Sequence, residues 1–356
     1  MLYLVKLEDL EQRYTIKMHE EIVKYCIEES VAYNVIKGNL LQSKISVGAF
    51  LDANSTTYYK ASQMGRIARK FADGKIKDGD KFLVYDMWYP GIEMIKYMAF
   101  FNRVKDIKVY GIAHAGSWTP SDFVAQMIWP FGLEKFWFQD YYDKVFVGTE
   151  HHKREIIEAL QVPENRIIVT RLPFWQIPIT HQEKSDTVIF ASRPHKEKGF
   201  EEFIDLVWAD ANNRYFYTIT GGGLDMLDFA DIGSDYREKL CYLLLMNRVQ
   251  QKILRTKEEF YAYLGTCKYL FSWAQQENWG YSMLEGVSLG CYPLVRKGKS
   301  YDEMFANMGI KQYDSFDELK SDFLQGKIEY KYLDIFEAFN GEVYDGAKNI
   351  INEVLE

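Results

Sequence analysis

Cysteine is scarce in this chain of 356 residues, and the four that occur are widely scattered: Cys26, Cys241, Cys267 and Cys291. No pair has the two-residue spacing of a zinc or redox motif, which argues against a disulfide framework and a structural zinc site. No apolar run approaches the ~18 residues of a membrane span, and the first residues lack the charged and then apolar pattern of a signal peptide. These absences predict a cytoplasmic protein without membrane insertion.

Positive charge is also in short supply. Against 51 Asp and Glu stand 43 Lys and Arg, a formal charge of −8, which argues against a protein wrapped in nucleic acid or held on an anionic membrane. The residues through Thr170 carry 22 basic and 22 acidic side chains, so the acidity belongs to the second half. One region of the first half is crowded with cations and is either a solvated helix face and loop or a local basic surface: Arg66, Arg69, Lys70, Lys75, Lys77 and Lys81.

Length and composition indicate a folded protein of two domains. Hydrophobic residues make up 47% and charged residues 26% of the sequence, which excludes a disordered chain. Its 356 residues are enough for two domains that each bury a core. Aromatic residues reach 16%, a high share that predicts thick packing and allows some rings to stack on a sugar or a base.

Short apolar runs alternate with segments of helical periodicity along most of the chain. Residues 1–43 are expected to be mostly helical, because Leu10, Tyr14, Met18, Ile22 and Tyr25 recur at helical spacing. The predicted strands are 45–51, 81–85, 107–112, 144–147, 166–169, 187–192, 215–220, 251–254 and 268–273. Helical segments and short connectors between the strands favour parallel pairing with right-handed crossovers, and therefore an α/β protein.

A connector flanked by Pro163, Pro173 and Pro178 divides this alternation into two series. The sequence therefore predicts an N-terminal Rossmann-like domain over 1–172, which begins with the helical extension, and a second Rossmann-like domain over 173–340. A C-terminal helix within 341–356 is expected to pack back on the first domain. Two such domains are expected to face each other across a ligand-binding cleft.

The stretch from Trp273 to Val295 combines a strand end, a loop with glycine and the start of a helix. Glu277 and Glu285 bracket the loop and are too far apart to share one helical face. They are expected to surround a pocket at the carboxyl end of a strand, where open α/β sheets bind ligands. The structural alternative for Glu285 is a capping box with Ser282, which lies three residues before it.

Two further segments follow predicted strands. Arg193 and Lys198 lie between a strand and a helix, where a pair of cations can neutralise a diphosphate leaving group; the alternative is a loop with ordinary surface cations. His114 follows the strand 107–112 beside small residues that admit a ligand, and it can donate a hydrogen bond to a sugar hydroxyl. Its structural alternative is a histidine that only packs.

These segments resemble the glycosyltransferases of family 4, which are retaining enzymes with the GT-B fold. The stretch Glu277-Asn-Trp-Gly-Tyr-Ser-Met-Leu-Glu285 is similar to the E-x7-E signature of that family. Arg193 to Lys198, with the glycine after it, resembles the family's Arg-x4-Lys-Gly segment. The resemblance implies that Glu285 holds the ribose hydroxyls of a nucleotide-sugar and that Glu277 lies near the transferred sugar.

The same resemblance implies the remaining donor contacts. Arg193 and Lys198 would contact the diphosphate of the donor. The amides of Gly280, Tyr281 and Ser282, at the start of the helix, would face the diphosphate and the sugar, since a helix N-terminus attracts an anion. No metal and no other cofactor is implied, because cationic side chains and amides take the place of a metal.

Glu277 and His114 are the candidate catalytic residues, with His114 contacting the sugar from the N-terminal domain. The N-terminal part is also similar to glycosyltransferases of tailed bacteriophages, some of which glycosylate hydroxymethylated pyrimidines of DNA. This likeness is carried by Arg13-Tyr-Thr, Gly48-Ala-Phe-Leu-Asp52, Asp86-Met-Trp-Tyr-Pro-Gly91 and His114-Ala-Gly116.

The sequence thus predicts a retaining glycosyltransferase that moves a sugar from a nucleoside diphosphate, in particular a UDP-sugar, to a hydroxyl acceptor. A hydroxymethylated pyrimidine in phage DNA is one acceptor, and a glycan, a lipid or a small molecule are the others. The rival functions are a phosphorylase-like or epimerase chemistry on a similar scaffold and a module that binds a nucleotide-sugar without turnover. The sequence sets no oligomeric state.

Overall fold

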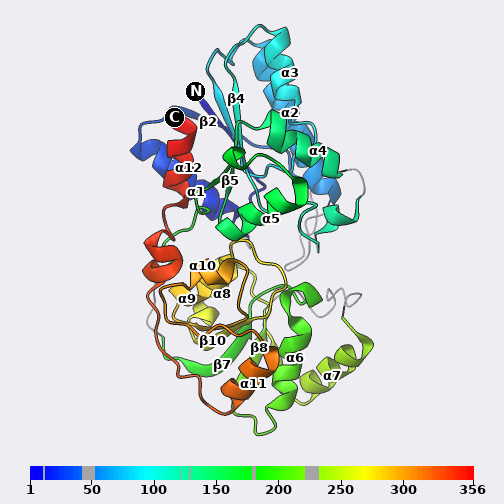
Figure 1. The fold of residues 1–356 in the computed structure, drawn as a ribbon, viewed down its shortest axis with the longest axis vertical. Helices are drawn as coiled ribbons and strands as arrows, with labels where there is room; N and C mark the ends of the chain where they lie inside the picture. The colour runs from blue at the N-terminus through cyan, green and yellow to red at the C-terminus, as the bar shows by residue number, and fades with distance from the viewer. Residues whose placement is uncertain (11–12, 42–52, 121, 128–129, 179–181, 221–231) are drawn as a thin grey trace. The chain divides into compact units, whose positions relative to one another are not determined.

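The structure is a computed structural model that describes residues 1–10, 13–41, 53–120, 122–127, 130–178, 182–220 and 232–356. Within these ranges the backbone forms two units, each built on a parallel sheet (Figure 1). The first unit comprises the described residues up to Trp175 together with Tyr344–Glu356, and the second comprises the described residues of Gln176–Val343. The strand predicted over 45–51 lies outside the described residues.

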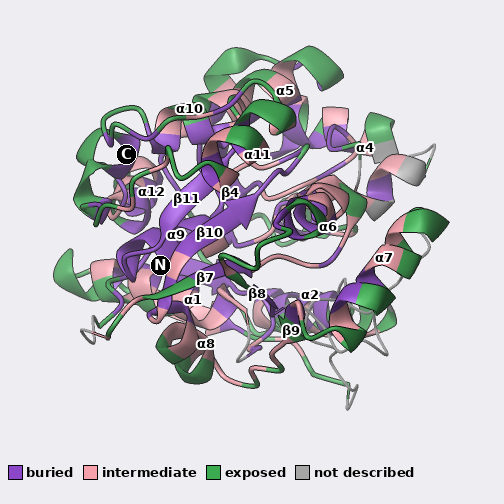
Figure 2. Ribbon diagram, turned by 90° about the horizontal axis from the view of Figure 1, so that it is seen from below, coloured by how far each residue is buried: buried purple, intermediate pink, exposed green. Residues whose placement is uncertain are grey.

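The first unit is a six-stranded sheet in the order β2-β1-β3-β4-β5-β6. Its strands are β1 (Leu2–Val5), β2 (Tyr33–Ile36), β3 (Lys81–Val84), β4 (Lys108–Ile112), β5 (Lys144–Val147) and β6 (Ile167–Val169). All neighbours pair in parallel, with Leu2 opposite both Tyr33 and Lys81. Continuous apolar runs such as those of β1 and β3 suit strands that are covered on both faces, and Figure 2 shows the strands of the core as buried.

Two of these strands show that the helical extension predicted for residues 1–43 is wrong. Strand β1 is fully buried and lies between β2 and β3, so the start of the chain forms part of the sheet. A run of only four apolar residues carries too little periodicity to stand out beside the helix that follows. That helix, α1 (Thr15–Glu28), is present and buries Met18 and Ile22, as the helical spacing predicted.

Helices pack on both sides of this sheet. They are α1, α2 (Ala53–Ala72), α3 (Met94–Phe101), α4 (Pro130–Phe136), α5 (Glu150–Leu160) and α12 (Gly346–Leu355), with short turns η1 (Phe123–Gln126), η2 (Trp137–Tyr141) and η3 (Glu164–Arg166). The hydroxyl of Thr149 caps α5 by accepting from the His152 amide, and Gln161 ends it in the left-handed conformation.

The C-terminal helix α12 packs against α1 (Figure 1). Lys144 Nζ lies 2.6 Å from Glu353 Oε2 and ties the helix to β5. At its start, Gly346 lies so close to Leu172 that a Cβ atom would come within 2.4 Å of the Leu172 carbonyl. Only glycine permits this approach.

The second unit is a five-stranded parallel sheet in the order β11-β10-β7-β8-β9. Its strands are β7 (Ser185–Phe190), β8 (Phe216–Ile219), β9 (Val249–Gln251), β10 (Cys267–Ser272) and β11 (Tyr292–Val295). Its helical segments are η4 (Lys196–Lys198), α6 (Phe200–Ala209), α7 (Ser234–Leu245), α8 (Lys257–Leu264), α9 (Tyr281–Ser288), α10 (Ser300–Met304), α11 (Phe316–Leu324) and η7 (Ile335–Gly341). Buried rings of Phe190, Phe203 and Phe271 contact one another between the sheet and α6.

Candidate active site

The second sheet changes direction between β7 and β10. From β7 the chain builds outward through β8 and β9, and it then adds β10 and β11 on the other side of β7. Because neighbouring loops diverge at such a switch point, they leave a crevice outside the strand ends, where open α/β sheets bind ligands. The loops that follow β7 and β10 carry Arg193, Lys198 and Glu277, so these predicted site residues flank the switch point.

The two loops are joined through their backbones. The Gln275 amide donates to the Glu197 carbonyl at 2.7 Å. Gly199 has a φ of 78° and packs so tightly on Trp273 that a Cβ atom would lie 2.4 Å from the Trp273 Cβ. Glycine is therefore required both for the left-handed backbone and for the close approach.

Lys198 and Glu277 form the centre of this cluster. Lys198 Nζ lies 3.5 Å from Glu277 Oε2 and 3.3 Å from Glu197 Oε1, and it donates to the Gln276 carbonyl at 3.2 Å. Burial alone would lower the pKa of the Lys198 ammonium, but Glu277 and Glu197 more than offset this and the pKa is raised. Lys198 is therefore a permanent cation.

Arg193 joins the cluster through Glu197, a residue that the sequence analysis missed. Arg193 Nη2 lies 3.2 Å from Glu197 Oε2. His195 Nδ1 accepts from the Glu197 amide at 3.3 Å and lies 3.6 Å from the same carboxylate oxygen. Glu197 thus holds both cations of the loop in place, and its position between them in the sequence was the one available signal.

Helix α9 begins directly beside Glu277. Gly280 precedes it with a φ of 77°, and its amide donates to Glu277 Oε1 at 3.0 Å. The amides of Met283 and Leu284 donate to the Gly280 carbonyl, both at 3.0 Å, so Tyr281 and Ser282 supply the first-turn amides. These N–H groups point out of the helix start, which favours an anionic ligand.

Glu285 does not form the capping box with Ser282, and that alternative is wrong. Gly280 is the N-cap residue and no side chain caps the helix. Glu285 is instead 1% exposed, and its Oε1 accepts from Tyr261 Oη at 2.8 Å and from Lys257 Nζ. Lys257 and Tyr261 lie four residues apart on α8, and nothing in their sequence spacing linked them to Glu285.

Trp279 packs within the protein. Its ring stacks on Phe339 with centroids 4.3 Å apart and planes 5° apart, and it is 3% exposed. Its indole Nε1 is buried and has no hydrogen-bond partner among the residues that the structure describes. Trp279 is therefore a packing residue.

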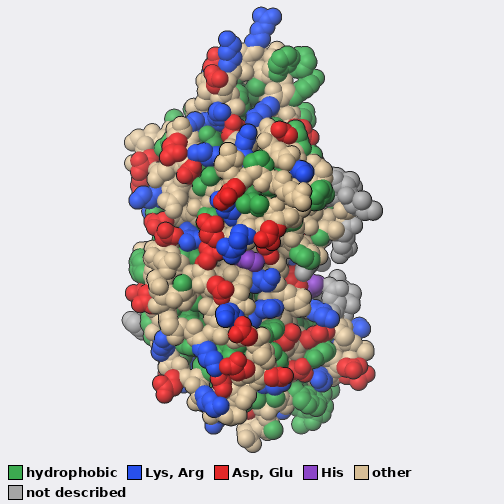
Figure 3. Space-filling view, in the orientation of Figure 1, with side chains coloured by type: hydrophobic (Ala, Val, Ile, Leu, Met, Phe, Trp, Pro, Cys, Tyr) green, Lys and Arg blue, Asp and Glu red, His purple; other side chains and the backbone are tan. Residues whose placement is uncertain are grey.

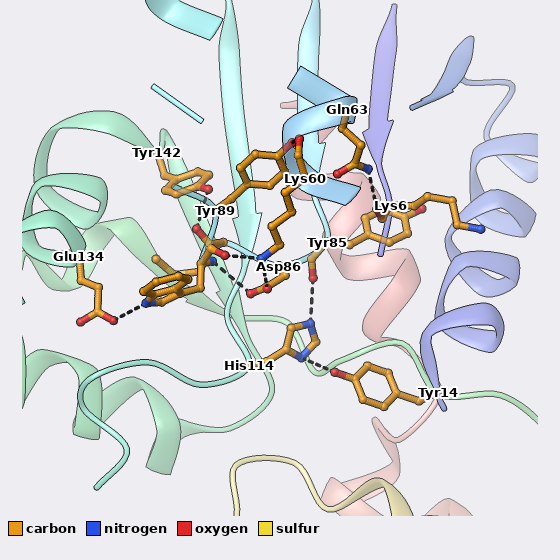
Figure 4. A network of polar contacts seen from close by, with 12 residues as sticks. Lys6, Tyr14, Lys60, Gln63, Tyr85, Asp86, Tyr89, His114, Glu134 and Tyr142 are labelled. Atoms are coloured by element: carbon orange, nitrogen blue, oxygen red, sulfur yellow. Dashed lines mark hydrogen bonds and ion pairs between the residues drawn. The ribbon is translucent and has the colours of Figure 1, made fainter. Parts of the chain in front are cut away.

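In the first unit His114 lies at the carboxyl ends of β3 and β4 (Figure 4). Its Nε2 donates to the Tyr85 carbonyl at 2.8 Å, which leaves Nδ1 to accept from Tyr14 Oη at 3.4 Å. Burial lowers the pKa of the imidazole, and the nearby Asp86 carboxylate offsets only part of this effect. His114 is therefore neutral at pH 7.

A second cluster of polar side chains surrounds Asp86 (Figure 4). Asp86 Oδ2 lies 2.7 Å from Lys60 Nζ, and Asp86 Oδ1 accepts from the Trp88 amide at 3.1 Å. The indole of Trp88 donates to Glu134 Oε1 at 2.8 Å, and Ser117 donates to both oxygens of Glu134. Glu134 is fully buried, and burial raises its pKa against the opposing effect of these hydrogen bonds.

These contacts bring together segments that are far apart in the sequence. Tyr14, Asp86 and His114 belong to three of the four segments that resemble phage glycosyltransferases, and all three lie in this network. The fourth segment, Gly48 to Asp52, lies outside the described residues. Glu134 and Lys60 were missed, because each stands in a helix without a motif around it.

A small pocket, with room for about one water molecule, lies at the switch point of the first sheet, between β1 and β3. Glu8, Lys60, Gln63 and Asp86 are among its polar lining residues. Glu8 is 5% exposed, and its Oε1 is buried without a hydrogen-bond partner in the described ranges. The pocket can therefore hold a water-sized group that donates a hydrogen bond to this carboxylate.

No family model matches the chain. Among solved structures it is similar to a mutant of S. aureus TarM, in complex with fondaparinux, alpha-GlcNAc-glycerol and UDP: 16% of residues are identical, the TM-score is 0.52, and the match covers 82% of this chain and 56% of TarM. It is also similar to HepE of Anabaena in complex with UDP and glucose (11% identity, TM-score 0.59, 100% of this chain and 95% of HepE). A third is sucrose-phosphate synthase of Thermosynechococcus elongatus (11% identity, TM-score 0.63, 99% and 94%).

The chain has the GT-B fold. This confirms the α/β class with two Rossmann-like sheets that the sequence predicted. The chain spans little more than half the length of TarM, at 56%.

Within this GT-B protein, one cluster contains Arg193, Lys198, Glu277 and Gly280. Glu285 of α9 instead contacts side chains of α8, and His114 belongs to the network of the first unit. The turn of three glycines at 221–223, which follows the predicted strand 215–220, lies outside the described residues. Within the described ranges, no group of three or more His, Cys, Asp or Glu is placed to hold a metal ion. None of the helices that the structure describes has both the length and the apolar character needed to cross a bilayer.

Proposed function

We propose that the protein is a retaining glycosyltransferase that transfers a sugar from a UDP-sugar to a hydroxyl acceptor. The observation that carries the proposal is the contact of Lys198 with Glu277 at the switch point of the second sheet, beside the start of α9. A permanent cation, a carboxylate and first-turn amides are the groups that a diphosphate and a sugar require. The likeness to solved GT-B structures with bound UDP supports it.

In this proposal the cations and amides bind the diphosphate. Arg193 and Lys198 are already paired with Glu197 and Glu277, so they are oriented before the donor arrives. A bound diphosphate takes over part of these contacts, which frees Glu277 Oε2 to accept from a sugar hydroxyl. The amides of Tyr281 and Ser282 complete the anion site, and the stabilisation grows as the phosphate leaves.

Glu285 is assigned to the ribose. Both of its observed hydrogen bonds fall on Oε1, from Tyr261 and Lys257. In the proposal Oε2 therefore accepts from the ribose hydroxyls, and α8 fixes the direction in which this oxygen points. No metal or other cofactor takes part, since Lys198 and Arg193 carry the compensating charge.

The transfer step needs no base from the protein. The bond between the sugar C1 and the phosphate oxygen breaks, and a bond from C1 to the acceptor oxygen forms on the same face. The acceptor proton passes to the departing phosphate oxygen, so the products are UDP and an α- or β-glycoside with the donor's configuration. His114 is neutral and its one N–H donates to the Tyr85 carbonyl, so it is assigned to the sugar only as an acceptor at Nδ1, where a sugar hydroxyl replaces Tyr14 Oη.

The acceptor is assigned to the first unit. A hydroxymethylated pyrimidine in phage DNA is the acceptor that the likeness to phage enzymes favours. A glycan, a lipid or a small molecule is the alternative.

The test is incubation of the protein with radiolabelled nucleotide-sugars, UDP-sugars first, against DNA that contains hydroxymethylated pyrimidines and against simple saccharides. We expect label in one acceptor, with the donor's anomeric configuration by NMR. Inversion of configuration would overturn the retaining mechanism. A changed sugar-nucleotide without acceptor would indicate an epimerase, and binding without any product a module that lacks turnover; either result would refute transfer.

A further inference from the structure

Helix α3 of the first unit presents an apolar ridge to solvent. Its inner face packs into the core through Ile95 and Ala99, with Met98 partly buried beside them. On the outer face the exposed fractions are 43% for Met94, 63% for Tyr97, 79% for Phe100 and 64% for Phe101. A surface helix of a soluble domain turns polar residues outward, so a helix that is apolar on both faces is one that another surface covers.

The end of α3 is anchored to the core of the first unit, and the exposed rings of the ridge contact one another. The Val104 amide donates to the Ala99 carbonyl at 2.9 Å and closes the turn that ends α3, while Val104 itself packs against the core. The rings of Tyr97 and Phe101 lie 4.7 Å apart between centroids, and those of Phe100 and Phe101 lie 5.5 Å apart. The aromatic side chains therefore form one continuous patch.

Cations stand beside this patch without acidic partners. Arg103 and Lys105 lie in the turn before β4, and Lys77 lies in the turn before β3. All three are exposed, and none forms an ion pair with any residue in the described part of the chain. The two turns are bonded to each other, since the Gly79 amide donates to the Lys105 carbonyl at 3.0 Å. Figure 3 shows hydrophobic side chains gathered over α3, with Lys and Arg side chains close by.

The local charge is opposite to that of the whole chain. Segments 66–81 and 94–108 together contain ten Lys and Arg and four Asp, in a chain whose net charge is −8. The basic run that stood out in the sequence, from Arg66 to Lys81, is one of these two segments. Of its cations, Lys77 lies beside the patch, whereas Arg69 and Lys75 pair with Asp73. Lys81 Nζ donates to the Val354 and Leu355 carbonyls of α12.

We propose that α3 and the two basic turns dock on an anionic lipid bilayer. Tyr97, Phe100 and Phe101 enter the headgroup region, and Arg103, Lys105 and Lys77 contact lipid phosphates. Aromatic rings that insert and cations that attract anionic lipid are the combination that holds peripheral proteins on a membrane. A single strand of nucleic acid fits less well, because it needs rings spaced along a basic groove, whereas these rings contact one another.

Docking at this surface is compatible with the sites of the first unit. The basic turns precede β3 and β4, so they lie at the amino ends of these strands, whereas His114 and Asp86 follow the carboxyl ends. The inference does not depend on the proposed function, since it uses none of the residues assigned to the donor.

The test is co-sedimentation of the full chain with vesicles of phosphatidylcholine alone and of phosphatidylcholine mixed with phosphatidylglycerol. We expect the protein to pellet with the mixed vesicles, and less so as salt rises. Replacing Phe100 and Phe101 by serine should lower partition by at least about tenfold. Replacing Arg103 and Lys105 by serine should lower it about fivefold per residue on the anionic vesicles only.

The control is Leu245→Ser, which removes an 81% exposed apolar side chain from the second unit and should leave partition unchanged. Thermal melting of each variant shows that it is folded. The proposal is overturned if the wild type stays in the supernatant with mixed vesicles, or if the double serine variant pellets as the wild type does. It is also overturned if the aromatic substitutions instead abolish a dimer or binding of single-stranded DNA.

Discussion

Lys198 Nζ lies 3.5 Å from Glu277 Oε2, and this contact joins the loop after β7 to the loop after β10. Both side chains are mostly buried, at 21% and 18% exposure. A buried pair of opposite charges is costly to form unless further hydrogen bonds support it, and here Gln276 and Gly280 supply them. The pair is therefore placed to exchange its mutual contact for those of a charged ligand.

Glu277→Gln should separate transfer from donor binding. The substitution keeps the shape of the side chain but removes the negative charge that contacts Lys198 and, in the proposal, the sugar. We expect kcat to fall by about 10²–10³-fold while the affinity for UDP changes little. Steady-state kinetics and calorimetry with UDP measure the two effects. The matched control is Glu258→Gln, which changes an exposed carboxylate on α8. Unchanged turnover in Glu277→Gln would reject the role of Glu277 in transfer.

Removing the cation beside Glu285 should destabilise the protein strongly. Lys257→Met leaves the carboxylate of Glu285 buried at 1% exposure without its charged partner. We expect a loss of about 3–5 kcal/mol in the free energy of unfolding by urea. Adding Glu285→Leu should restore most of the stability, because the buried charge is then gone, but should not restore UDP binding. A loss below about 1 kcal/mol in Lys257→Met would show that solvent already compensates Glu285.

Gly199→Ala should disturb the junction of the two loops. Its φ of 78° strains any side chain, and the new Cβ would lie 2.4 Å from Trp273 Cβ. We expect a loss of more than about 1 kcal/mol in stability together with weaker donor binding. Gly65→Ala is the control, because nothing lies within 4 Å of its Cβ in the interior of α2. Gly65→Ala should be stabilised by about 0.5–1 kcal/mol. An equal change in the free energy of unfolding of the two variants would contradict the close packing of Gly199 on Trp273.

Acid should weaken the first unit through His152. This side chain is fully buried, its Nε2 accepts from Trp118 Nε1 at 3.1 Å, and burial lowers its pKa to about 3. Above pH 6.5 both the folded and the unfolded states are neutral. As the pH falls below 6.5 only the unfolded state gains the proton, so stability falls by up to about 1.4 kcal/mol per pH unit. Urea unfolding between pH 7 and 5 should show this slope, and His152→Gln should flatten it; an equal slope in both would refute the assignment.

Much of the fold could be predicted from the sequence, because long helices and buried strands differ in period. Strand β5 has the predicted bounds, and α12 lies within the predicted segment 341–356. Strands β1 and β2 were missed, since four residues give no periodicity and the neighbouring helix dominated the pattern. The observed topology therefore differs from the predicted one, because β1 lies at the switch point of the first sheet.

The candidate site was predictable only where a motif lies within one loop. Arg193, Lys198 and Glu277 follow strands that become neighbours, so their contact follows from the sheet order. Glu197, Lys257 and Tyr261 could not be predicted, because they act through tertiary contacts without a sequence spacing. The same holds for Glu134, which is buried in the first unit and bonded to Ser117 and Trp88.

The most direct test of the donor site is calorimetric titration of UDP into three proteins: the wild type, Lys198→Met and Lys196→Met. Lys196 is the matched control, since it belongs to the same short turn but its side chain is 58% exposed and points to Glu201. We predict that the wild type and Lys196→Met bind UDP alike and that Lys198→Met binds at least about tenfold more weakly. Equal UDP affinity in Lys198→Met and the wild type, or no binding by the wild type, would contradict the placement of the donor diphosphate at Lys198.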